Sequence, residues 1–376
     1  MPTESRPLRL LMVAARCFPY IGGVETHIYE VGKRLARAGV EVTVLSTDLS
    51  GQLPIVEESE GMQIRRVRAW PRDKDYYFAP GLYRVITGGQ WDIVHCQGYH
   101  NLVAPLAMLA AQRAKIPYVV TFHSGGDSSR LRKAVRGVQR MALRPLLARA
   151  KLLICPSKWE LEFFRDRLHL PDNQFVIIPN GAHHLLHSVD PSAGITDGTL
   201  ILSVGRLEQY KGHHRLIAAM PKLLEEVPDA RLRIVGVGPY EPTLHKLARK
   251  HGVAESVEIR AVPPGDQHGM ASLISRANLV TLLSEHEAQG IAILEALALQ
   301  RPVLVAGSTA LQEFAERGLA RAVSLKGTPE DVAAAMIDQL RMPLVPVNVE
   351  LPTWDDCAVA LLALYCKITG RETCAS

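Results

Sequence analysis

The sequence lacks the marks of several protein classes. Its six cysteines are scattered and no two are spaced as CxxC, which argues for a reducing compartment and against a disulfide framework or a zinc site. No apolar run reaches transmembrane length, and the short apolar stretch near the amino terminus fits a first strand better than a signal peptide. Internal repeats and low-complexity tracts are also absent. We therefore expect a cytoplasmic globular protein.

The composition is that of an ordinary soluble chain with a mild positive charge. Its 376 residues suggest two domains or one large one. Apolar residues make up 47% and charged residues 22%, as in most globular folds. The net charge of +5 and the pI near 8.9 fit an anionic substrate or surface. No nucleic-acid-binding motif accompanies this charge, so we expect no nucleic-acid partner.

Apolar runs typical of buried strands alternate with helical stretches in both halves of the chain. The predicted strands are residues 8–15, 40–46, 92–95, 118–121, 151–155 and 175–178, then 199–204, 231–235, 256–260, 279–283 and 302–306. Between the halves, residues 183–198 are rich in turn formers and predict a linker. Strands joined through helices form parallel sheets. The fold class is therefore α/β, with two Rossmann-like, doubly wound domains at 1–190 and 191–353 facing across a cleft.

The stretch from Ser284 to Ala296 places two carboxylates at a strand-to-helix junction. Glu287 falls in the loop after a predicted strand, and Glu295 falls inside the helix that follows Gly290. The free N–H groups and positive dipole at a helix start attract an anion. A phosphate could bind the amides of Gly290 and Ile291 while each carboxylate binds the hydroxyls of a sugar ring. A nucleotide sugar has this layout, with a diphosphate between a ribose and a hexose.

Two cationic residues lie in the short loop that follows the first predicted strand of the second half. Arg206 and Lys211 in this position can hold a diphosphate and stabilise negative charge on a departing group. The alternative interpretation of these residues is a solvated basic loop without a function. The two carboxylates in the stretch from Ser284 to Ala296 favour the functional interpretation.

The first half carries weaker candidates of the same kind. Gly22 and Gly23 would let the backbone approach a phosphate or sugar at a helix start, although a plain loop explains them as well. His123 ends a predicted strand, where a histidine can bind a hydroxyl or transfer a proton. A lone histidine is more often structural. Asn180, followed by Gly181, predicts a turn first and a ligand contact only second.

Two further patterns are incomplete versions of known sites. Gly236 and Gly238 open a helix after a strand, but Glu241 stands where a dinucleotide fingerprint needs its third glycine. Asp73 and Asp75 have the Asp-x-Asp form that can hold a metal ion, but no clear strand precedes them. We expect a tight turn near a phosphate at the first and no metal at the second.

Residues 128–159 contain no acid, and the predicted helix at 130–151 is basic on one side and apolar on the other. Such a helix can lie on an anionic membrane or bind an acceptor phosphate, which would make the protein peripheral at the inner membrane face. It can equally be a solvated face that packs on the sheet by its apolar side. A second basic cluster could belong to the same surface: Arg65, Arg66, Arg68, Trp70 and Arg72.

Together these residues resemble a family-four retaining glycosyltransferase of the GT-B fold, also called a group 1 glycosyltransferase. The resemblance covers most of the chain. It rests on four motifs in order: Gly22-Gly23-Val24-Glu25, Pro179-Asn180-Gly181, Val204-Gly205-Arg206 with Lys211-Gly212, and Glu287 and Glu295 with seven residues between them.

The resemblance implies a role for each site residue. Arg206 and Lys211 would hold the diphosphate, Glu295 the ribose and Glu287 the transferred sugar, with His123 near that sugar. It also implies that a helix at about 354–376 crosses back to the acceptor-side first domain. Three residues depart from the family pattern. Ala288-Gln289 replaces a glycine and an aromatic residue beside the sugar, and Ala261 replaces a glycine near the base.

The function predicted from the sequence is transfer of a sugar from a nucleotide diphosphate sugar to an acceptor hydroxyl, with retention at the anomeric carbon. A UDP-sugar is favoured over GDP-mannose as donor, and the acceptor is a glycan, a lipid-linked or a natural-product hydroxyl. We expect no cofactor and no metal. The alternatives are a nucleotide-sugar epimerase of the same fold, a dinucleotide oxidoreductase that uses Gly236 and Gly238, and a non-catalytic membrane-surface protein.

Overall fold

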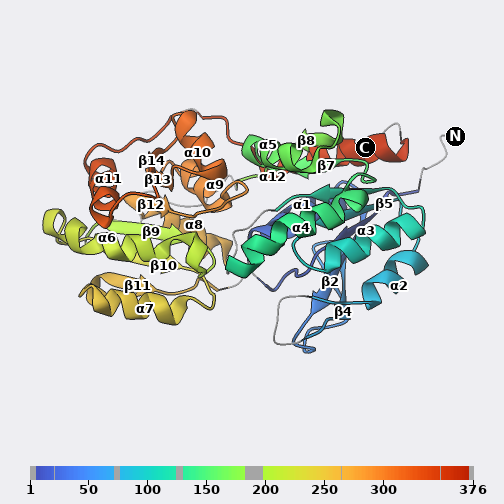
Figure 1. The fold of residues 1–376 in the computed structure, drawn as a ribbon, viewed down its shortest axis with the longest axis horizontal. Helices are drawn as coiled ribbons and strands as arrows, with labels where there is room; N and C mark the ends of the chain where they lie inside the picture. The colour runs from blue at the N-terminus through green and yellow to red at the C-terminus, as the bar shows by residue number, and fades with distance from the viewer. Residues whose placement is uncertain are drawn as a thin grey trace. The chain divides into compact units, whose positions relative to one another are not determined.

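A computed structural model of the chain describes residues 6–20, 22–71, 77–123, 130–182, 198–263, 265–347 and 349–371, without the side chains of 130–135. The chain folds into two compact units (Figure 1). The first contains Ala134–Asn180, the chain before Ser124 and the carboxyl-terminal segment from Trp354. The second consists mainly of Gly181–Thr353. The predicted boundary at 190/191 lies outside the described residues, in the gap from 183 to 197.

The first unit is built on a sheet with the order β3-β4-β2-β1-β5-β6-β7-β8, parallel throughout except for the edge strand β3. Its strands are β1 (Arg9–Val13), β2 (Glu41–Asp48), β3 (Val56–Ser59), β4 (Met62–Arg68), β5 (Ile93–Gln97), β6 (Tyr118–Thr121), β7 (Leu153–Cys155) and β8 (Phe175–Ile177). The central strands are buried along their whole length, as expected for a parallel sheet covered on both faces.

Helices cover both faces of this sheet. They are α1 (Gly23–Arg37), α2 (Gly81–Gly88), α3 (Val103–Arg113), α4 (Arg130–Leu147), α5 (Lys158–Leu168) and α12 (Trp354–Thr369), with the 3-10 turn η1 (Asp172–Gln174). Residues of α2, α3, α4 and α5 share one apolar core with β1, β5 and β6. On the other face α1 packs against α12. Helix α12 is fixed there by an ion pair of 2.8 Å between Arg34 and Asp355 and a buried hydrogen bond of 2.6 Å between His95 and Tyr365.

The second unit has a fully parallel six-stranded sheet with the order β11-β10-β9-β12-β13-β14. Its strands are β9 (Leu200–Val204), β10 (Arg231–Val235), β11 (Val257–Ile259), β12 (Leu279–Leu282), β13 (Val303–Ala306) and β14 (Arg321–Val323). This is the 3-2-1-4-5-6 order of a doubly wound nucleotide-binding fold. The chain turns from one half of the sheet to the other between β9 and β12, so a ligand site is expected beyond the carboxyl ends of these two strands.

Two cores flank this sheet, one on each face. Its helices are α6 (His213–Glu226), α7 (Glu241–Lys250), α8 (Gln267–Ser275), α9 (Ile291–Ala298), α10 (Thr309–Glu316) and α11 (Pro329–Arg341), with 3-10 turns η3 (Gln209–Lys211) and η4 (Ala254–Ser256). Helices α8, α9 and α10 bury their apolar side on one face, and α6, α7 and α11 on the other. Helix α11 begins with a capping box in which Thr328 and Asp331 satisfy each other's backbone N–H groups.

The observed fold confirms the predicted α/β class with two doubly wound sheets. One local interpretation was wrong. Strand β4 ends at Arg68, so a strand does precede the Asp73 and Asp75 pair; both aspartates lie outside the described residues. The basic cluster on β4 is not a continuous surface either, because Arg66 is buried and its guanidinium pairs with Glu57 at 2.6 Å.

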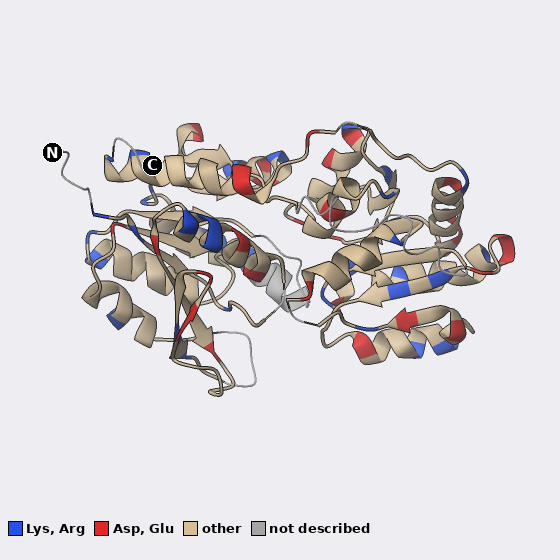
Figure 2. Ribbon diagram, turned by 180° about the vertical axis from the view of Figure 1, so that it is seen from behind, with Lys and Arg blue, Asp and Glu red and all other residues tan. Residues whose placement is uncertain are grey.

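The structure also shows the state of the described cysteines and the distribution of the charged residues. Cys17, Cys96, Cys155 and Cys357 are free and buried, whereas Cys366 is disulfide-bonded, a departure from the expected absence of disulfides. Basic and acidic positions are interspersed along the helices of both units (Figure 2). None of the described helices is long and apolar enough to span a bilayer.

Candidate functional site

The strongest candidate site lies in the second unit, where the loops after β9 and β12 meet. The first loop runs from Gly205 to Gly212 and carries Arg206 and Lys211; the second carries Glu287 and ends at Gly290. Two hydrogen bonds join the loops, since the backbone N–H of Glu285 and the hydroxyl of Ser284 both donate to the carbonyl of Tyr210, at 2.7 and 3.2 Å. The predicted cations and carboxylate are thus held on two loops that are fastened to each other.

Gly212 lets the two loops come this close. Its φ is +77°, in the left-handed region that favours glycine, and it caps helix α6. A Cβ atom on Gly212 would lie 1.9 Å from the carbonyl oxygen of Leu283. Any side chain would therefore push Lys211 away from the loop that follows β12.

Lys211 and Glu287 form an ion pair across the two loops. The side chains are only 16% and 11% exposed, so the pair is largely shielded from water. Burial by itself would lower the pKa of Lys211, but the carboxylate of Glu287 more than offsets this and the pKa is raised. Glu287 also donates its backbone N–H to the hydroxyl of Thr309, at 3.2 Å. The lysine is therefore a fixed positive charge at neutral pH.

Arg206 stands on the same loop in a different environment. Its side chain is 41% exposed, and its guanidinium pairs with Glu208 at 3.2 Å. The half-exposed guanidinium of Arg206 and the largely shielded ammonium of Lys211 place two positive charges on one loop. Such a pair suits an anion that carries more than one negative charge.

Helix α9 begins beside this loop with a backbone that is open to an anion. Gly290, with φ of +89°, is its N-cap and Ile291 its first residue. The carbonyl of Gly290 accepts from Ile293 and Leu294 at 3.0 and 3.2 Å, whereas the N–H groups of Ile291 and Ala292 come too early in the helix to have an acceptor within it. Glu295 follows one turn later and is half-buried. The helix start that the sequence predicts after Gly290 is present.

The turn at Gly236 and Gly238 supports the Arg206 loop from behind. The N–H of Leu207 donates to Val237 O at 3.0 Å, and a Cβ on Gly238 would lie 2.4 Å from Leu207 O. On Gly236 a Cβ would lie 1.9 Å from Gly205 O. These glycines are needed for contact with the protein's own backbone. That close packing removes the main support for a dinucleotide site at this turn.

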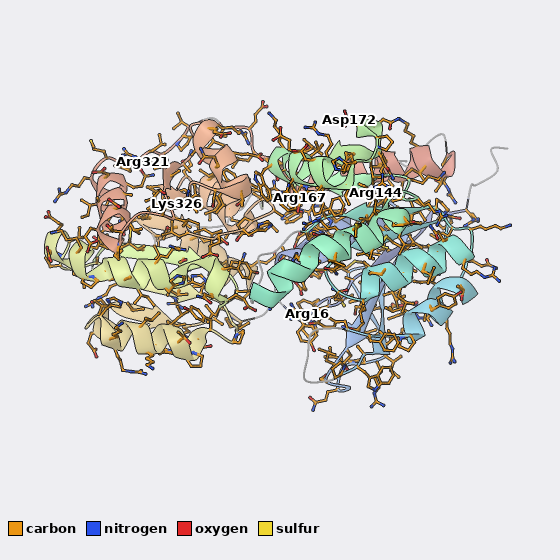
Figure 3. The ribbon with its side chains drawn as sticks, in the orientation of Figure 1. Arg16, Arg144, Arg167, Asp172, Arg321 and Lys326 are labelled. Carbon is orange, nitrogen blue, oxygen red and sulfur yellow. The ribbon has the colours of Figure 1, made fainter. Side chains whose placement is uncertain are left out.

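In the first unit, the start of α1 already holds a carboxylate. Gly22 is its N-cap, and a Cβ on Gly22 would lie 2.4 Å from the carboxylate of Glu25. That carboxylate is buried and pairs with Arg16, labelled in Figure 3, at 3.2 Å. Gly22 therefore gives space first to a side chain of the same helix.

His123 follows β6 by two residues and lies within a cluster of polar groups. It contacts Gln97 through Nε2 at 2.7 Å, and its carbonyl accepts from His100 at 2.8 Å. The ring of His27 lies edge-on to it, with 5.0 Å between centroids. Burial and the neighbouring histidines hold the pKa of His123 well below its usual value, so the imidazole is neutral at pH 7.

Asn180 has a structural partner that the sequence did not indicate. Its side-chain oxygen accepts from Nδ1 of the buried His27 at 2.7 Å, so the turn at 180–181 is fastened to α1. Burial lowers the pKa of His27 to about 4. Nothing in the sequence pairs residues 27 and 180, because their contact depends on how α1 packs on the sheet.

Some side chains of the basic helix α4 contact the rest of the protein, and others are exposed to solvent. Arg144 reaches the carbonyls at the end of α5, donating to Leu168 O and His169 O at 2.7 and 3.0 Å (Figure 3). Leu143 and Leu147 are buried, but Val138 and Met141 are 63% and 71% exposed. The apolar side of the helix is therefore only partly packed on the sheet.

Two family models together match most of the chain. The model described as Glycosyltransferase Family 4 covers residues 21–184, and the model described as Glycosyl transferases group 1 covers residues 190–350. The chain belongs to the family-four, group 1 glycosyltransferases. The motif-based identification from the sequence is confirmed.

The proteins and solved structures similar to this glycosyltransferase include several named activities. A D-inositol 3-phosphate glycosyltransferase from Nocardiopsis dassonvillei is 28% identical over 363 residues, 86% of this chain and 82% of the relative. A sucrose-phosphate synthase structure from Thermosynechococcus elongatus matches with a TM-score of 0.79 at 21% identity, covering 96% and 99% of the two chains. The structure of Anabaena HepE in complex with UDP-glucose matches with a TM-score of 0.71 at 17% identity, covering 96% and 95%. These structures confirm the GT-B fold.

Sequence reasoning missed the residues that hold the loops of this glycosyltransferase in place. Tyr210 acts through its backbone carbonyl, and Ser284 and Thr309 act through hydroxyls that bond to backbone groups. None of the three carries a recognisable spacing signal. His213 is buried next to Lys211, and its position directly after Gly212 gives no hint of its partners. The Lys211–Glu287 pair itself was predicted only as two separate ligands.

Proposed function

We propose that this glycosyltransferase moves a sugar from a nucleotide diphosphate sugar, a UDP-sugar in preference to GDP-mannose, to an acceptor hydroxyl with retention. The observation that carries the proposal is the placement of Lys211, Arg206 and the start of α9 at the turning point of a nucleotide-binding sheet. All three are positive, and they are contributed by adjoining loops. The UDP-glucose complex of HepE, which has the same fold, supports this choice of donor.

In the proposed reaction, the bond between the anomeric carbon and the β-phosphate oxygen breaks while the acceptor oxygen bonds to the same face of that carbon. The developing charge on the diphosphate is stabilised by Arg206, Lys211 and the N–H groups at Gly290 and Ile291. The acceptor proton passes to a phosphate oxygen of the leaving group. Glu295 binds the ribose hydroxyls, and Glu287 binds the transferred sugar.

We also propose that His123 binds a hydroxyl of the transferred sugar and that Gly22 and Gly23 take part in donor binding. A neutral imidazole can both donate and accept a hydrogen bond, which suits a sugar hydroxyl better than a charged one. The low pKa of His123 keeps it in that form. We assign the acceptor to a hydroxyl on a glycan, a lipid-linked or a natural-product substrate.

Calorimetric titration of the full chain with UDP, GDP, ADP and NAD tests the nucleotide assignment. We expect binding of UDP, weaker binding of GDP, and none of NAD. Binding of NAD alone would restore the oxidoreductase alternative. The same-fold epimerase alternative is tested by incubating a UDP-sugar without acceptor, because an epimerase would convert the sugar and a transferase would leave it intact apart from slow hydrolysis.

We propose that the reaction needs no metal ion, because the protein's own cations can neutralise the diphosphate. Turnover measured in EDTA should equal turnover in buffer alone. Loss of activity in EDTA that returns on adding Mg²⁺ or Mn²⁺ would contradict this. Stereochemistry is read from the anomeric proton of the product by NMR, and an inverted product would contradict retention.

We also propose that α4 places the protein at an anionic membrane surface. Val138 and Met141 are exposed on α4, which also carries Arg140. Arg149 and Lys151 follow shortly after the end of this helix. Each basic residue near such a surface contributes about 1 kcal/mol. Co-sedimentation with vesicles rich in phosphatidylglycerol, but not with pure phosphatidylcholine, is expected.

The matched variants for this test remove exposed apolar residues. Val138→Ser with Met141→Ser should reduce vesicle binding several-fold. Val359→Ser, at a valine that is 67% exposed on α12, serves as the control and should leave it unchanged. Equal binding by all three proteins would show that α4 is an ordinary solvated helix.

A further inference from the structure

One buried side chain in the second unit connects the sheet to the loop that carries the cations. His213, the first residue of α6, has no exposed surface. Its Nδ1 lies 3.0 Å from the hydroxyl of Ser203 on β9, and its Nε2 lies 3.3 Å from the carbonyl oxygen of Arg206. The imidazole therefore connects Ser203, near the end of strand β9, with the backbone of Arg206 in the loop that follows this strand.

The two contacts determine how the imidazole is protonated. A carbonyl oxygen can only accept, so Nε2 carries the hydrogen and donates to Arg206 O. A neutral imidazole has a single N–H, so Nδ1 must accept from the hydroxyl of Ser203. Burial, with the nearby positive charge of Lys211, lowers the pKa of His213 to about 4, consistent with one neutral form.

The rest of the Arg206 loop is held by its backbone. The N–H of Gly205 donates to Val235 O at 2.9 Å, and the carbonyl of Leu207 accepts from Tyr240 at 2.9 Å. Arg206 lies between these two anchors, and its carbonyl accepts a backbone bond from Glu208 at 2.8 Å besides the bond from His213. The bond from His213 ties the peptide of Arg206 to a group outside the loop.

We infer that His213 is a positioning residue for diphosphate binding, which sets the direction of Arg206 by holding its peptide. The inference rests on the proposed function. It goes further in assigning a role to a residue that never touches the donor. Losing the bond should let the peptide of Arg206 rotate, which would displace its guanidinium from the β-phosphate. A displacement of about 1 Å can cost on the order of 100-fold in rate.

Three substitutions separate this role from simple packing. His213→Gln keeps an N–H donor near the Nε2 position and should retain the bond to Arg206. His213→Asn keeps a polar atom near Nδ1 and loses that bond, while His213→Leu loses both. The readout is the ratio of affinities for a nucleoside diphosphate and its monophosphate, with whichever of UDP, GDP or ADP the wild type binds. This ratio isolates the contribution of the β-phosphate.

For His213→Asn and His213→Leu we expect the ratio to fall roughly tenfold, with monophosphate affinity changed less than about threefold. His213→Gln should stay within about threefold of wild type. An unchanged ratio in folded His213→Asn would overturn the inference, as would equal losses of both affinities in all three variants. If the wild type itself binds diphosphates no better than monophosphates, the proposed function fails first, and the inference fails with it.

Discussion

Lys211, on the loop after β9, forms a shielded ion pair with Glu287, on the loop after β12. The pair joins the residue proposed to hold the diphosphate to the residue proposed to hold the sugar. In the absence of donor each charge has the other as its partner, which offsets the cost of burying them. A bound diphosphate would compete with Glu287 for the lysine. The same two residues are therefore proposed to contribute both to the stability of the second unit and to the chemistry.

Removing one member of this pair should destabilise the protein, and removing both charges should not. Lys211→Met leaves a buried carboxylate without its partner and should cost about 3–5 kcal/mol in the free energy of unfolding. Adding Glu287→Gln should recover most of that loss. Transfer activity should stay abolished in both proteins. Urea unfolding with parallel kinetic assays checks this, and recovery of activity together with stability would contradict the proposed roles.

Arg206 should behave in the opposite way, because it is half exposed and forms only a surface pair with Glu208. Arg206→Ala should change the free energy of unfolding by less than about 0.5 kcal/mol. We expect kcat to fall by roughly 100- to 1,000-fold, the usual cost of losing a donor to developing charge. Arg231→Ala, at an exposed arginine of the same unit, is the control. Equal activity in the two variants would remove Arg206 from the site.

The turn behind the Arg206 loop gives a test of Gly238. A Cβ there would lie 2.4 Å from Leu207 O, and the position has no unusual backbone conformation to confuse the result. Gly238→Ala should push the loop outward and weaken UDP binding at least tenfold without creating affinity for NAD. Gly88→Ala provides a matched control, because no atom lies within 4 Å of a Cβ there and its backbone is not in the left-handed region. Unchanged UDP binding in Gly238→Ala would contradict the supporting role.

The sequence predicted the sheets and the polar ends of their strands well, because both depend on local patterns. Continuous apolar runs mark parallel strands, and Arg206, Lys211, Glu287 and Gly290 all follow such runs. Strands β3, β4 and β14 were not predicted. Strand β3 alternates exposed and half-buried residues at the sheet edge, β4 alternates buried residues with more exposed ones, and β14 has only three residues. The contacts of His27 with Asn180 and of His213 with Arg206 could not be predicted. They arise from the packing of helices on the sheets, which leaves no periodic signal.

Stability should fall as the pH drops from 7.5 to 5.5. Burial lowers the pKa of His27 and of His213 to about 4, below the value of an unfolded histidine near 6.5. Between these values the unfolded chain binds protons that the folded chain does not, so acid favours unfolding. Each residue should contribute about 1.4 kcal/mol of the loss by pH 5.5. Urea unfolding of His27→Gln should show a correspondingly smaller pH dependence, and an identical one would contradict the assignment.

Thr309 combines a strained backbone with a contact to the site. Its φ of +54° is unusual for a β-branched residue, and its hydroxyl accepts the backbone N–H of Glu287 at 3.2 Å. Strain of this kind costs roughly 1–3 kcal/mol and persists where other contacts require it.

Thr309→Gly should therefore relieve strain and leave the protein as stable or more stable, while freeing Glu287 to move and lowering kcat at least tenfold. Thr309→Ser retains the hydroxyl and should keep most of the activity. Thermal unfolding and steady-state kinetics on the same preparations check both effects. A glycine variant with full activity would show that the strained threonine does not position Glu287, whereas gained stability with lost activity would show that the strain supports the site.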